Sequence, residues 1–285
     1  PLGLEDANAM NPIDNTFQAL RDKKRKAFIP FITAGDPDVD TTVALARELA
    51  ARGASLIEIG IPYSDPIADG SVIQASYTRA LDKGVKIDAI LAALRTLTVS
   101  PDWKESGVPL VAMVSFSLVH HRGPERFIAQ AREAGLSGAI VPDLPVDEAE
   151  PLAREAAKQD FKLIQLVTPT TPRERALRIA RTSTGFLYCV SVVGITGERS
   201  EIPPSLLEQL AWLRGQTPLP LCVGFGISTP TEAAAVATYA DAVVVGSALV
   251  RLVETHAGSP QVVTEVGAFL RALKAACRRQ SASAA

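Results

Sequence analysis

Eight short apolar runs alternate with longer amphipathic stretches along this chain, beginning near Lys26. Such a rhythm is typical of repeated strand–helix units that build a parallel sheet, and eight units predict a (β/α)₈ barrel of the TIM type. The expected strands are Ala27–Thr33, Ser55–Gly60, Pro109–Val114, Gly138–Val141, Lys162–Val167, Phe186–Val190, Leu221–Gly224 and Ala242–Val245. The expected helices include 40–52, 87–97, 124–134, 146–158, 172–181, 204–214 and 229–237, with an extra N-terminal helix at 12–23 and a C-terminal helix at 260–279.

The even spacing of these runs, without a break in composition, favours a single domain. A chain of 285 residues is long for an ordinary domain, but one barrel commonly reaches about 250 residues. We therefore expect a barrel domain over residues 10–279, preceded by a disordered leader or expression remnant at 1–9 and followed by a flexible tail at 280–285. A doubly wound open sheet is the alternative, yet no Gly-x-Gly-x-x-Gly motif follows the first expected strand.

The composition points to a soluble protein that acts on a small molecule. The 29 basic and 31 acidic residues give a net charge of −2, and without an extended basic block a nucleic-acid surface is not expected. No apolar stretch reaches the ~20 residues needed to cross a bilayer. Cys189, Cys222 and Cys277 are too few and too scattered for a disulfide framework. These features predict a cytoplasmic protein without membrane or nucleic-acid partners.

An ionisable carboxyl, Glu58, interrupts the apolar run of the second expected strand. Side chains alternate along a strand, so if Ile57 and Ile59 face the helices, Glu58 points into the barrel. Its pKa should then be raised by burial, as suits a group that donates and accepts a proton near neutral pH. Asp69, in the loop that follows, would bring a second carboxyl to the carboxyl end of the sheet. The alternative is a core glutamate that pairs with an arginine or caps the backbone.

Glycine-bearing turns follow the last three expected strands, at Val193–Gly197, Val223–Ser228 and Val245–Ser247. In such barrels the loops after the seventh and eighth strands commonly bind phosphate, because glycine lets backbone N–H groups approach an oxyanion. Ser247 adds a hydroxyl donor. The alternative is that these glycines only form tight turns, but three such turns in succession favour a phosphorylated ligand.

The remaining polar residues disfavour metal and Schiff-base chemistry. The histidines, His120, His121 and His256, have no carboxylate or cysteine at ligand spacing on one helix face, so no metal is expected. The lysines fall at strand starts, in helices or in loops rather than near strand ends inside the barrel. Tyr188, on the sixth expected strand, is the other polar side chain expected at the mouth. The sequence therefore predicts carboxylate acid–base catalysis on a phosphorylated substrate.

Four sequence blocks, in order along the chain, closely resemble the tryptophan synthase alpha chain family. They are Phe31–Pro37, Ile57–Gly70, Asp143–Pro145 and Gly224–Pro230, and the similarity runs over most of residues 12–274. The resemblance implies a lyase that cleaves indole-3-glycerol phosphate to indole and D-glyceraldehyde 3-phosphate by a retro-aldol reaction without a cofactor. It also implies a place in tryptophan biosynthesis, as the alpha subunit of an α₂β₂ heterotetramer with a tryptophan synthase beta chain.

The resemblance also implies roles for particular residues. Glu58 would carry the proton to indole C3 and from the glycerol hydroxyl, and Asp69 would hold the indole N–H. Phe31 would pack on the indole, and Tyr188 would line its pocket. The resemblance further implies that Thr196 belongs to a lid loop. The other substrate-binding residues that it implies are Gly197, Phe225, Gly226, Gly246 and Ser247.

Departures from the family pattern leave other functions open. The segment Ser115–Leu118 lies where the family usually has Tyr-Asn-Pro, in a region that lines the pocket and contacts the beta chain. Val192 and Val193 replace a usual Arg-Thr, and Ser71 replaces a usual Pro. A second hypothesis is therefore a stand-alone indole-3-glycerol-phosphate lyase of specialised metabolism, without a beta partner. A third is a non-catalytic barrel that acts as an activator, which the intact carboxyls and glycine turns disfavour.

Overall fold

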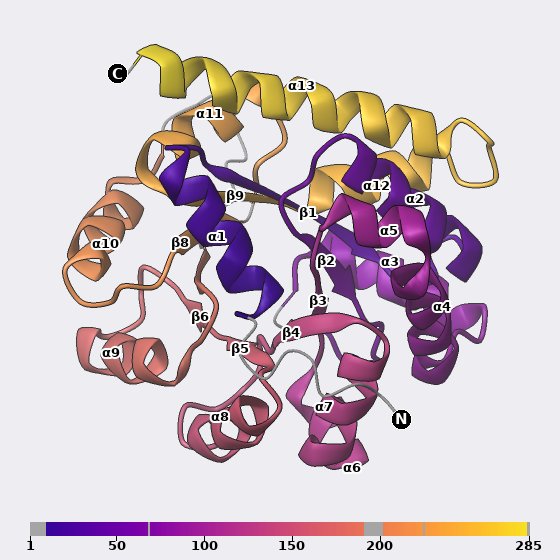
Figure 1. Ribbon diagram of the computed structural model, residues 1–285, viewed down its shortest axis with the longest axis horizontal. Coiled ribbons are helices and arrows are strands. Elements are labelled where there is room, and N and C mark those ends of the chain that lie inside the picture. Colours follow the sequence, from indigo (N-terminus) through magenta and orange to yellow (C-terminus); the bar gives the residue numbers. More distant parts are fainter. Residues whose placement is uncertain (1–9, 68, 191–201, 225, 284–285) are drawn as a thin grey trace.

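The computed structural model describes residues 10–67, 69–190, 202–224 and 226–283. In this part of the chain nine parallel strands form one sheet that curves into a barrel, and helices surround it (Figure 1). The strands are β1 (Ala27–Thr33), β2 (Ile57–Gly60), β3 (Leu110–Met113), β4 (Leu136–Ile140), β5 (Lys162–Ile164), β6 (Leu166–Val167), β7 (Leu187–Val190), β8 (Leu221–Gly224) and β9 (Ala242–Val245). β5 and β6 are the two halves of one strand, the fifth, so the nine strands make a ring of eight. The predicted (β/α)₈ barrel is therefore confirmed.

The fifth strand is divided at Gln165, between β5 and β6, at a place that we call the seam. The sheet order β5-β4-β3-β2-β1-β9-β8-β7-β6 has these two strands at its ends, and β5 pairs with β4 whereas β6 pairs with β7. Here the N–H of Leu163 in β5 donates to Thr184 Oγ1 at 2.8 Å, and that of Gln165, between β5 and β6, donates to Ser183 Oγ at 3.1 Å. Side-chain hydroxyls therefore satisfy backbone groups that a strand partner would otherwise bind.

Helices cover the outside of the barrel, and those expected from the sequence are present. They are α1 (Pro12–Asp22), α2 (Val39–Ala51), α4 (Ile87–Val99), α7 (Pro124–Glu133), α8 (Ala149–Lys158), α9 (Arg173–Thr182), α10 (Pro204–Arg214), α11 (Pro230–Tyr239) and α13 (Val262–Ser283). Further helices, which the apolar pattern does not predict, are α3 (Ser71–Asp82), α5 (Pro101–Ser106), α6 (Phe116–Arg122) and α12 (Ser247–Thr255). Two of these are too short to show a helical period, because they span barely two turns.

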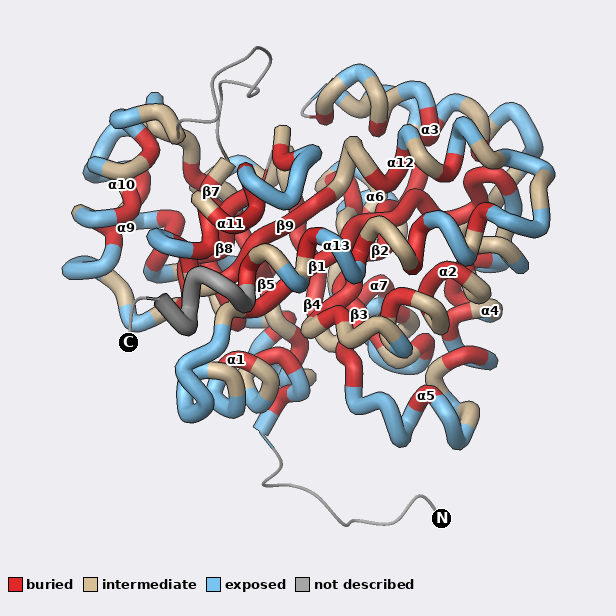
Figure 2. The backbone as a smooth tube through the Cα atoms, turned by 90° about the horizontal axis from the view of Figure 1, so that it is seen from above, coloured by how far each residue is buried: buried red, intermediate tan, exposed pale blue. Residues whose placement is uncertain are grey.

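Apolar side chains form two layers, one inside the barrel and one between the sheet and the helices. Leu56 and Ile29 belong to the interior cluster, whereas Ile57 and Ile59 belong to the larger cluster under the helices. Figure 2 shows buried chain along the strands and exposed chain on the outer helices. Because side chains alternate along β2, Glu58 shares the inward face with Leu56, as expected from the sequence.

Helix α1 closes the amino end of the barrel. The side chain of Asn11 caps it by accepting from the N–H of Ile13 at 3.0 Å, and Pro12 occupies the first turn. Ile13 and Phe17 belong to the interior cluster, where the rings of Phe17 and Phe186 lie 5.7 Å apart. The carboxyl ends of the strands, at the opposite side, remain for the functional site.

A leader at 1–9 and a flexible tail at 280–285 are expected from the sequence at the two ends of the chain. Residues 1–9 and 284–285 lie outside the described residues. Helix α13 runs to Ser283, so helical backbone extends past Arg279 into the segment expected as a flexible tail. Among the described helices, none combines the length and the apolar content that crossing a bilayer requires.

Candidate active site at the mouth of the barrel

Glu58 faces the interior of the barrel between its neighbours in register, Phe31 of β1 and Val111 of β3. The residue is 1% exposed, and neither carboxyl oxygen has a hydrogen-bond partner among the described residues. Burial raises the pKa of Glu58 well above its ordinary value, because an apolar wall solvates a carboxylate poorly. The carboxyl therefore keeps its proton to a higher pH than an exposed glutamate, and the described part of the chain offers it no arginine partner.

Asp69 is the second buried carboxyl, and it lies in the loop after β2. The loop holds it through the bond from its N–H to Pro66 O at 3.0 Å, and through the bond from Gln74 Nε2 to its carbonyl oxygen at 2.7 Å. The hydroxyl of Tyr63 donates to Asp69 Oδ2 at 3.2 Å. Burial raises the pKa of Asp69 to about 6, the hydrogen bond from Tyr63 opposes that rise, and the charge of Asp143 adds to it.

A cavity of about 250 Å³ at the carboxyl end of the strands brings the two carboxyls together. The residues predicted from the sequence that line it are Phe31, Glu58, Asp69, Tyr188, Gly226, Gly246 and Ser247. The other predicted residues, Thr196, Gly197 and Phe225, lie outside the described residues, as do Val192 and Val193. Carboxyls and glycine turns that lie far apart in sequence therefore share one cavity.

Glycines on two strands make room for the aromatic side chains at the mouth. A Cβ added at Gly60 would lie 2.5 Å from Phe31 Cζ and 2.8 Å from Tyr77 Oη, and one added at Gly224 would overlap the hydroxyl of Tyr188. Burial raises the pKa of Tyr188, and the nearby Glu58 adds to the rise. Phe31 and Tyr188 can therefore form the walls of the cavity only because their neighbours lack side chains.

The glycine turns bring backbone N–H groups to the cavity. Gly226 has φ = +78°, in the left-handed region that favours glycine, and it lines the cavity. Gly246 directly precedes α12, and no side chain caps the N-terminus of this helix. Gly246 and Ser247 line the cavity, so the first-turn N–H groups and the Ser247 hydroxyl can bind an anion there. The interpretation as tight turns accounts for Gly226, but it does not account for an uncapped helix at the cavity wall.

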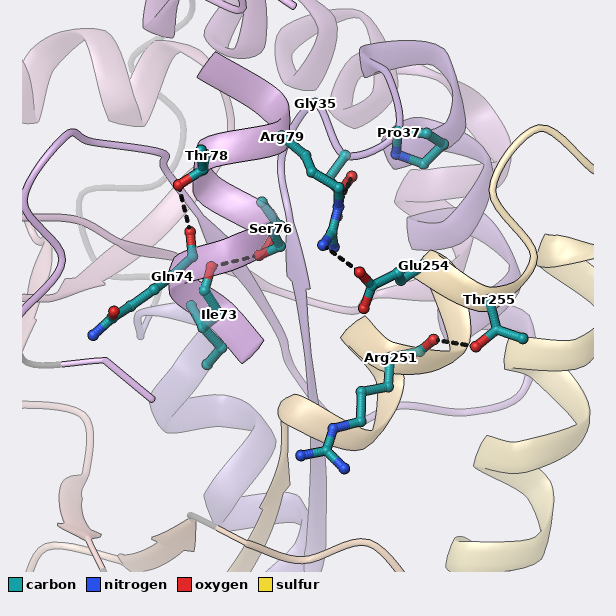
Figure 3. Close-up of polar contacts among 12 residues, drawn as sticks. Gly35, Pro37, Ile73, Gln74, Ser76, Thr78, Arg79, Arg251, Glu254 and Thr255 are labelled. Atoms are coloured by element: carbon teal, nitrogen blue, oxygen red, sulfur yellow. Dashed lines mark hydrogen bonds and ion pairs between the residues drawn. The ribbon is translucent and has the colours of Figure 1, made fainter. Parts of the chain in front are cut away.

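Helices α3 and α12 begin at the cavity, and Arg79 connects them further along. Arg79 of α3 donates from Nη1 to Glu254 Oε1 of α12 at 2.8 Å (Figure 3). It also donates to the buried carboxylate of Asp36, from Nε at 3.1 Å and from Nη2 at 2.7 Å. The loop after β1, the helix after Asp69 and the helix that starts at Ser247 are thereby held in one arrangement.

The segment that departs from the family pattern forms the start of α6 beside the cavity. Ser115 caps this helix, and its hydroxyl donates to Asp143 Oδ2 at 2.7 Å. The N–H of Phe116 donates to Asp143 Oδ1 at 2.6 Å. Both carboxylate oxygens of Asp143 therefore hold the altered segment in place, next to Met113 and Pro142 of the cavity wall.

Sequence reasoning did not identify several residues of the cavity wall. They are Ile73, Met113, Ile140, Pro142, Leu166, Thr168 and Val190. Met113, Ile140 and Val190 are the last residues of their strands. Because the carboxyl ends of the strands surround the functional site, this position could have predicted them from the sequence. Ile73 lies in α3, which the apolar pattern does not predict.

A second hollow, of about 240 Å³, lies beside α1 at the amino ends of the strands. Arg21, Lys24, Arg25 and Lys26 line it together with Asp241. It contains no pair of buried carboxyls, and in barrels of this kind the amino end supports stability rather than chemistry. The candidate active site is therefore the cavity at the carboxyl end.

Comparison with known proteins shows the family of the chain. The family model described as tryptophan synthase alpha chain matches residues 17–278. A curated tryptophan synthase alpha chain from Rhodopirellula baltica is 52% identical over 244 residues, which cover 86% of this chain and 87% of that protein. Another, from Rippkaea orientalis, is 47% identical over 272 residues, which cover 94% and 99% of the two chains.

Solved structures show the same similarity in three dimensions. The crystal structure of tryptophan synthase subunit alpha from Legionella pneumophila has a TM-score of 0.85 at 37% identity, and covers 95% of this chain and 100% of that chain. A structure of Mycobacterium tuberculosis tryptophan synthase has a TM-score of 0.83 at 31% identity, with 95% and 99% covered. Fold and sequence similarity thus extend over nearly the whole chain.

Proposed function

The chain belongs to the tryptophan synthase alpha chain family, and we propose how its cavity carries out the alpha-subunit lyase reaction. The substrate is indole-3-glycerol phosphate, and the products are indole and D-glyceraldehyde 3-phosphate. One observation carries the proposal: two buried carboxyls share a cavity with the uncapped N-terminus of α12. These groups fit the two ends of the substrate, because one end is an aromatic N–H heterocycle and the other is a phosphate.

Glu58 is the group that moves protons. In its protonated form it donates to indole C3, which converts the ring to an indolenine with positive character at nitrogen. The resulting carboxylate takes the proton from the hydroxyl on the adjacent glycerol carbon. The bond from that carbon to C3 then breaks, its electron pair returns to the ring, and the aldehyde leaves. Glu58 ends in the form in which it began, so the cycle needs no cofactor.

Asp69 stabilises the positive charge that forms at the indole nitrogen. Its pKa of about 6 leaves the carboxylate mostly ionised at pH 7, so it can accept the indole N–H. Phe31 of β1 and Tyr188 of β7 enclose the ring as walls of the cavity. Proton transfer and charge stabilisation of this kind each typically contribute a factor of ~10² to 10⁴ in rate.

Backbone groups around α12 hold the phosphate. The N–H groups of Gly246 and of the first turn of α12 point along the positive end of the helix, and the Ser247 hydroxyl adds a donor. Gly226 contributes a close backbone approach on the neighbouring loop. By resemblance, Thr196, Gly197 and Phe225 complete the site, and their part in binding is a proposal from sequence alone.

We propose that a tryptophan synthase beta chain is the partner, in an α₂β₂ heterotetramer in the cytoplasm. Ile67, in the loop that carries Asp69, is 89% exposed, and an apolar side chain so exposed is stabilised when a partner covers it. The altered segment Ser115–Leu118 is held in a defined conformation by Asp143. A defined conformation at this rim supports docking, despite the departure from the usual family sequence.

An indole-release assay, with and without a purified tryptophan synthase beta chain, tests this function. We expect indole from indole-3-glycerol phosphate, with strong stimulation and co-purification when the beta chain is added. Full activity without any stimulation would instead favour the stand-alone lyase of specialised metabolism. No indole under either condition would leave the non-catalytic barrel as the remaining hypothesis.

A further inference from the structure

Two tyrosines beside the carboxyls have no part in the reaction described above. Tyr63, in the loop after β2, is partly buried, and its hydroxyl donates to Asp69 Oδ2 at 3.2 Å. Tyr77, in α3, is fully buried, and its hydroxyl has no hydrogen-bond partner among the described residues. The centroids of the two rings lie 5.6 Å apart, and the rings are tilted by 53°. The Tyr63 hydroxyl thus binds a carboxyl of the candidate site, whereas the Tyr77 hydroxyl binds none of the described residues.

We propose that Tyr63 is a positioning residue, which orients the carboxylate of Asp69 and keeps it ionised for the lyase reaction. The inference rests on the proposed function, because it takes Asp69 as the acceptor of the indole N–H. Tyr63 binds Oδ2, so the carboxylate presents Oδ1 to the ring nitrogen. A carboxylate that is held by one oxygen loses less rotational freedom when the substrate arrives.

The surroundings of Asp69 make this hydrogen bond decisive for its charge. The titratable groups that face Asp69 from the described residues are Glu58 of β2, Tyr63 of the same loop, Tyr77 of α3, Asp143 of the loop after β4 and Tyr188 of β7. None of them is a cation. Burial and the charge of Asp143 both favour the protonated form of Asp69, and the bond from Tyr63 opposes them. Tyr63 therefore stabilises the charged form that the reaction uses.

The packing around Tyr77 keeps the Tyr63 ring in place. Tyr77 belongs to a small cluster with Phe31, Ile73 and Val250, and Tyr63 packs against this cluster. The ring of Tyr63 thus has an apolar support on the side of α3, while its hydroxyl reaches Asp69. Removing only that hydroxyl, in Tyr63→Phe, keeps the packing and deletes the hydrogen bond.

The test compares pH profiles of indole release by the full chain and by Tyr63→Phe, in complex with a beta chain. Loss of a donor to a carboxylate raises its pKa, so the acid limb of the kcat profile should move to higher pH by about one unit. With the pKa of Asp69 starting at about 6, kcat should fall roughly fivefold at pH 6 and by only about a tenth at pH 8. The KM for indole-3-glycerol phosphate above pH 8 should change little.

Tyr77→Phe is the matched control, because it removes a buried hydroxyl without a partner and keeps the ring. We expect its acid limb to coincide with that of the unaltered protein. Carbon-13 NMR titration of the Asp69 carboxyl gives a second readout that does not depend on activity. In Tyr63→Phe this titration should shift upward by the same amount as the kinetic limb.

The outcomes separate this inference from the proposed function. An unmoved Asp69 titration in Tyr63→Phe, or an equal shift in Tyr77→Phe, would overturn the role of Tyr63 and leave the lyase assignment intact. Absence of indole release by the unaltered chain, with and without a beta chain, would overturn both. A uniform loss of rate at every pH, without a shifted limb, would show a purely structural role and would also overturn the inference.

Discussion

Replacing Glu58 with glutamine keeps the shape of the buried side chain and removes its proton chemistry. The folded-state pKa of Glu58 is raised above the ordinary value of 4.5 by burial. The stability that this group contributes is therefore fully present below its unfolded pKa, and it is lost as the pH rises through the folded pKa. Glutamine does not titrate, so the variant keeps its stability across that window.

The expected magnitude follows from linkage. Relative to Glu58→Gln, the free energy of unfolding of the unaltered protein should fall by about 1.4 kcal/mol per pH unit above 4.5, until Glu58 itself ionises in the folded state. The same substitution should lower kcat for indole release by ~10² to 10⁴, because no proton can reach C3. Binding of glycerol phosphate should be unchanged.

Urea denaturation of both proteins at pH 5, 6, 7 and 8, together with an indole assay, measures these quantities. Glu105→Gln, on the exposed surface of α5, is the matched control and should release indole at the normal rate. A stability difference that stays constant over this pH range would show that Glu58 is not an uncharged buried carboxyl. Turnover at the normal rate by Glu58→Gln would refute the proton-shuttle role.

Two further substitutions test the other walls of the cavity. Gly226→Asp should weaken binding of glycerol phosphate about tenfold by like-charge repulsion, as measured by calorimetry. Gly226→Asn has the same strain at φ = +78° but no charge, so it should bind glycerol phosphate more tightly than Gly226→Asp. Equal affinities of the two variants would mean that the glycine serves only the turn. Gly224→Ala should impair indole release because its methyl group overlaps the Tyr188 hydroxyl, and adding Tyr188→Phe should restore part of the rate; equal impairment of single and double variants would contradict this.

The barrel and its two carboxyls could be predicted because both depend on local patterns. Short β-branched runs define the strands, and alternation along β2 alone turns Glu58 inward. Asp69 follows the same strand so closely that its loop has to end near the same edge of the sheet. The seam at Gln165 lay beyond this reasoning, because the run Lys162–Val167 reads as one continuous strand.

The missed features depend on how distant segments meet. Helix α3 mixes small polar and apolar residues, so its sequence shows a weak apolar stripe, and Ile73 was missed with it. The bond from Tyr63 to Asp69 depends on the path of a loop whose spacing carries no signature. Pro142 and Thr168 reach the cavity only because the barrel is closed, and closure is a property of the whole sheet rather than of a local motif.

The seam divides the fifth strand of the barrel between two partners. Its first half pairs with β4 and its second half with β7, and between the two halves the N–H of Tyr188 donates to Gln165 O at 3.1 Å. Because β9 also pairs with β1, no group of strands in the described ring can slide against another without breaking backbone hydrogen bonds. Leu166 lies directly after the seam and lines the cavity, so the wall at this point belongs to the rigid ring rather than to a movable loop.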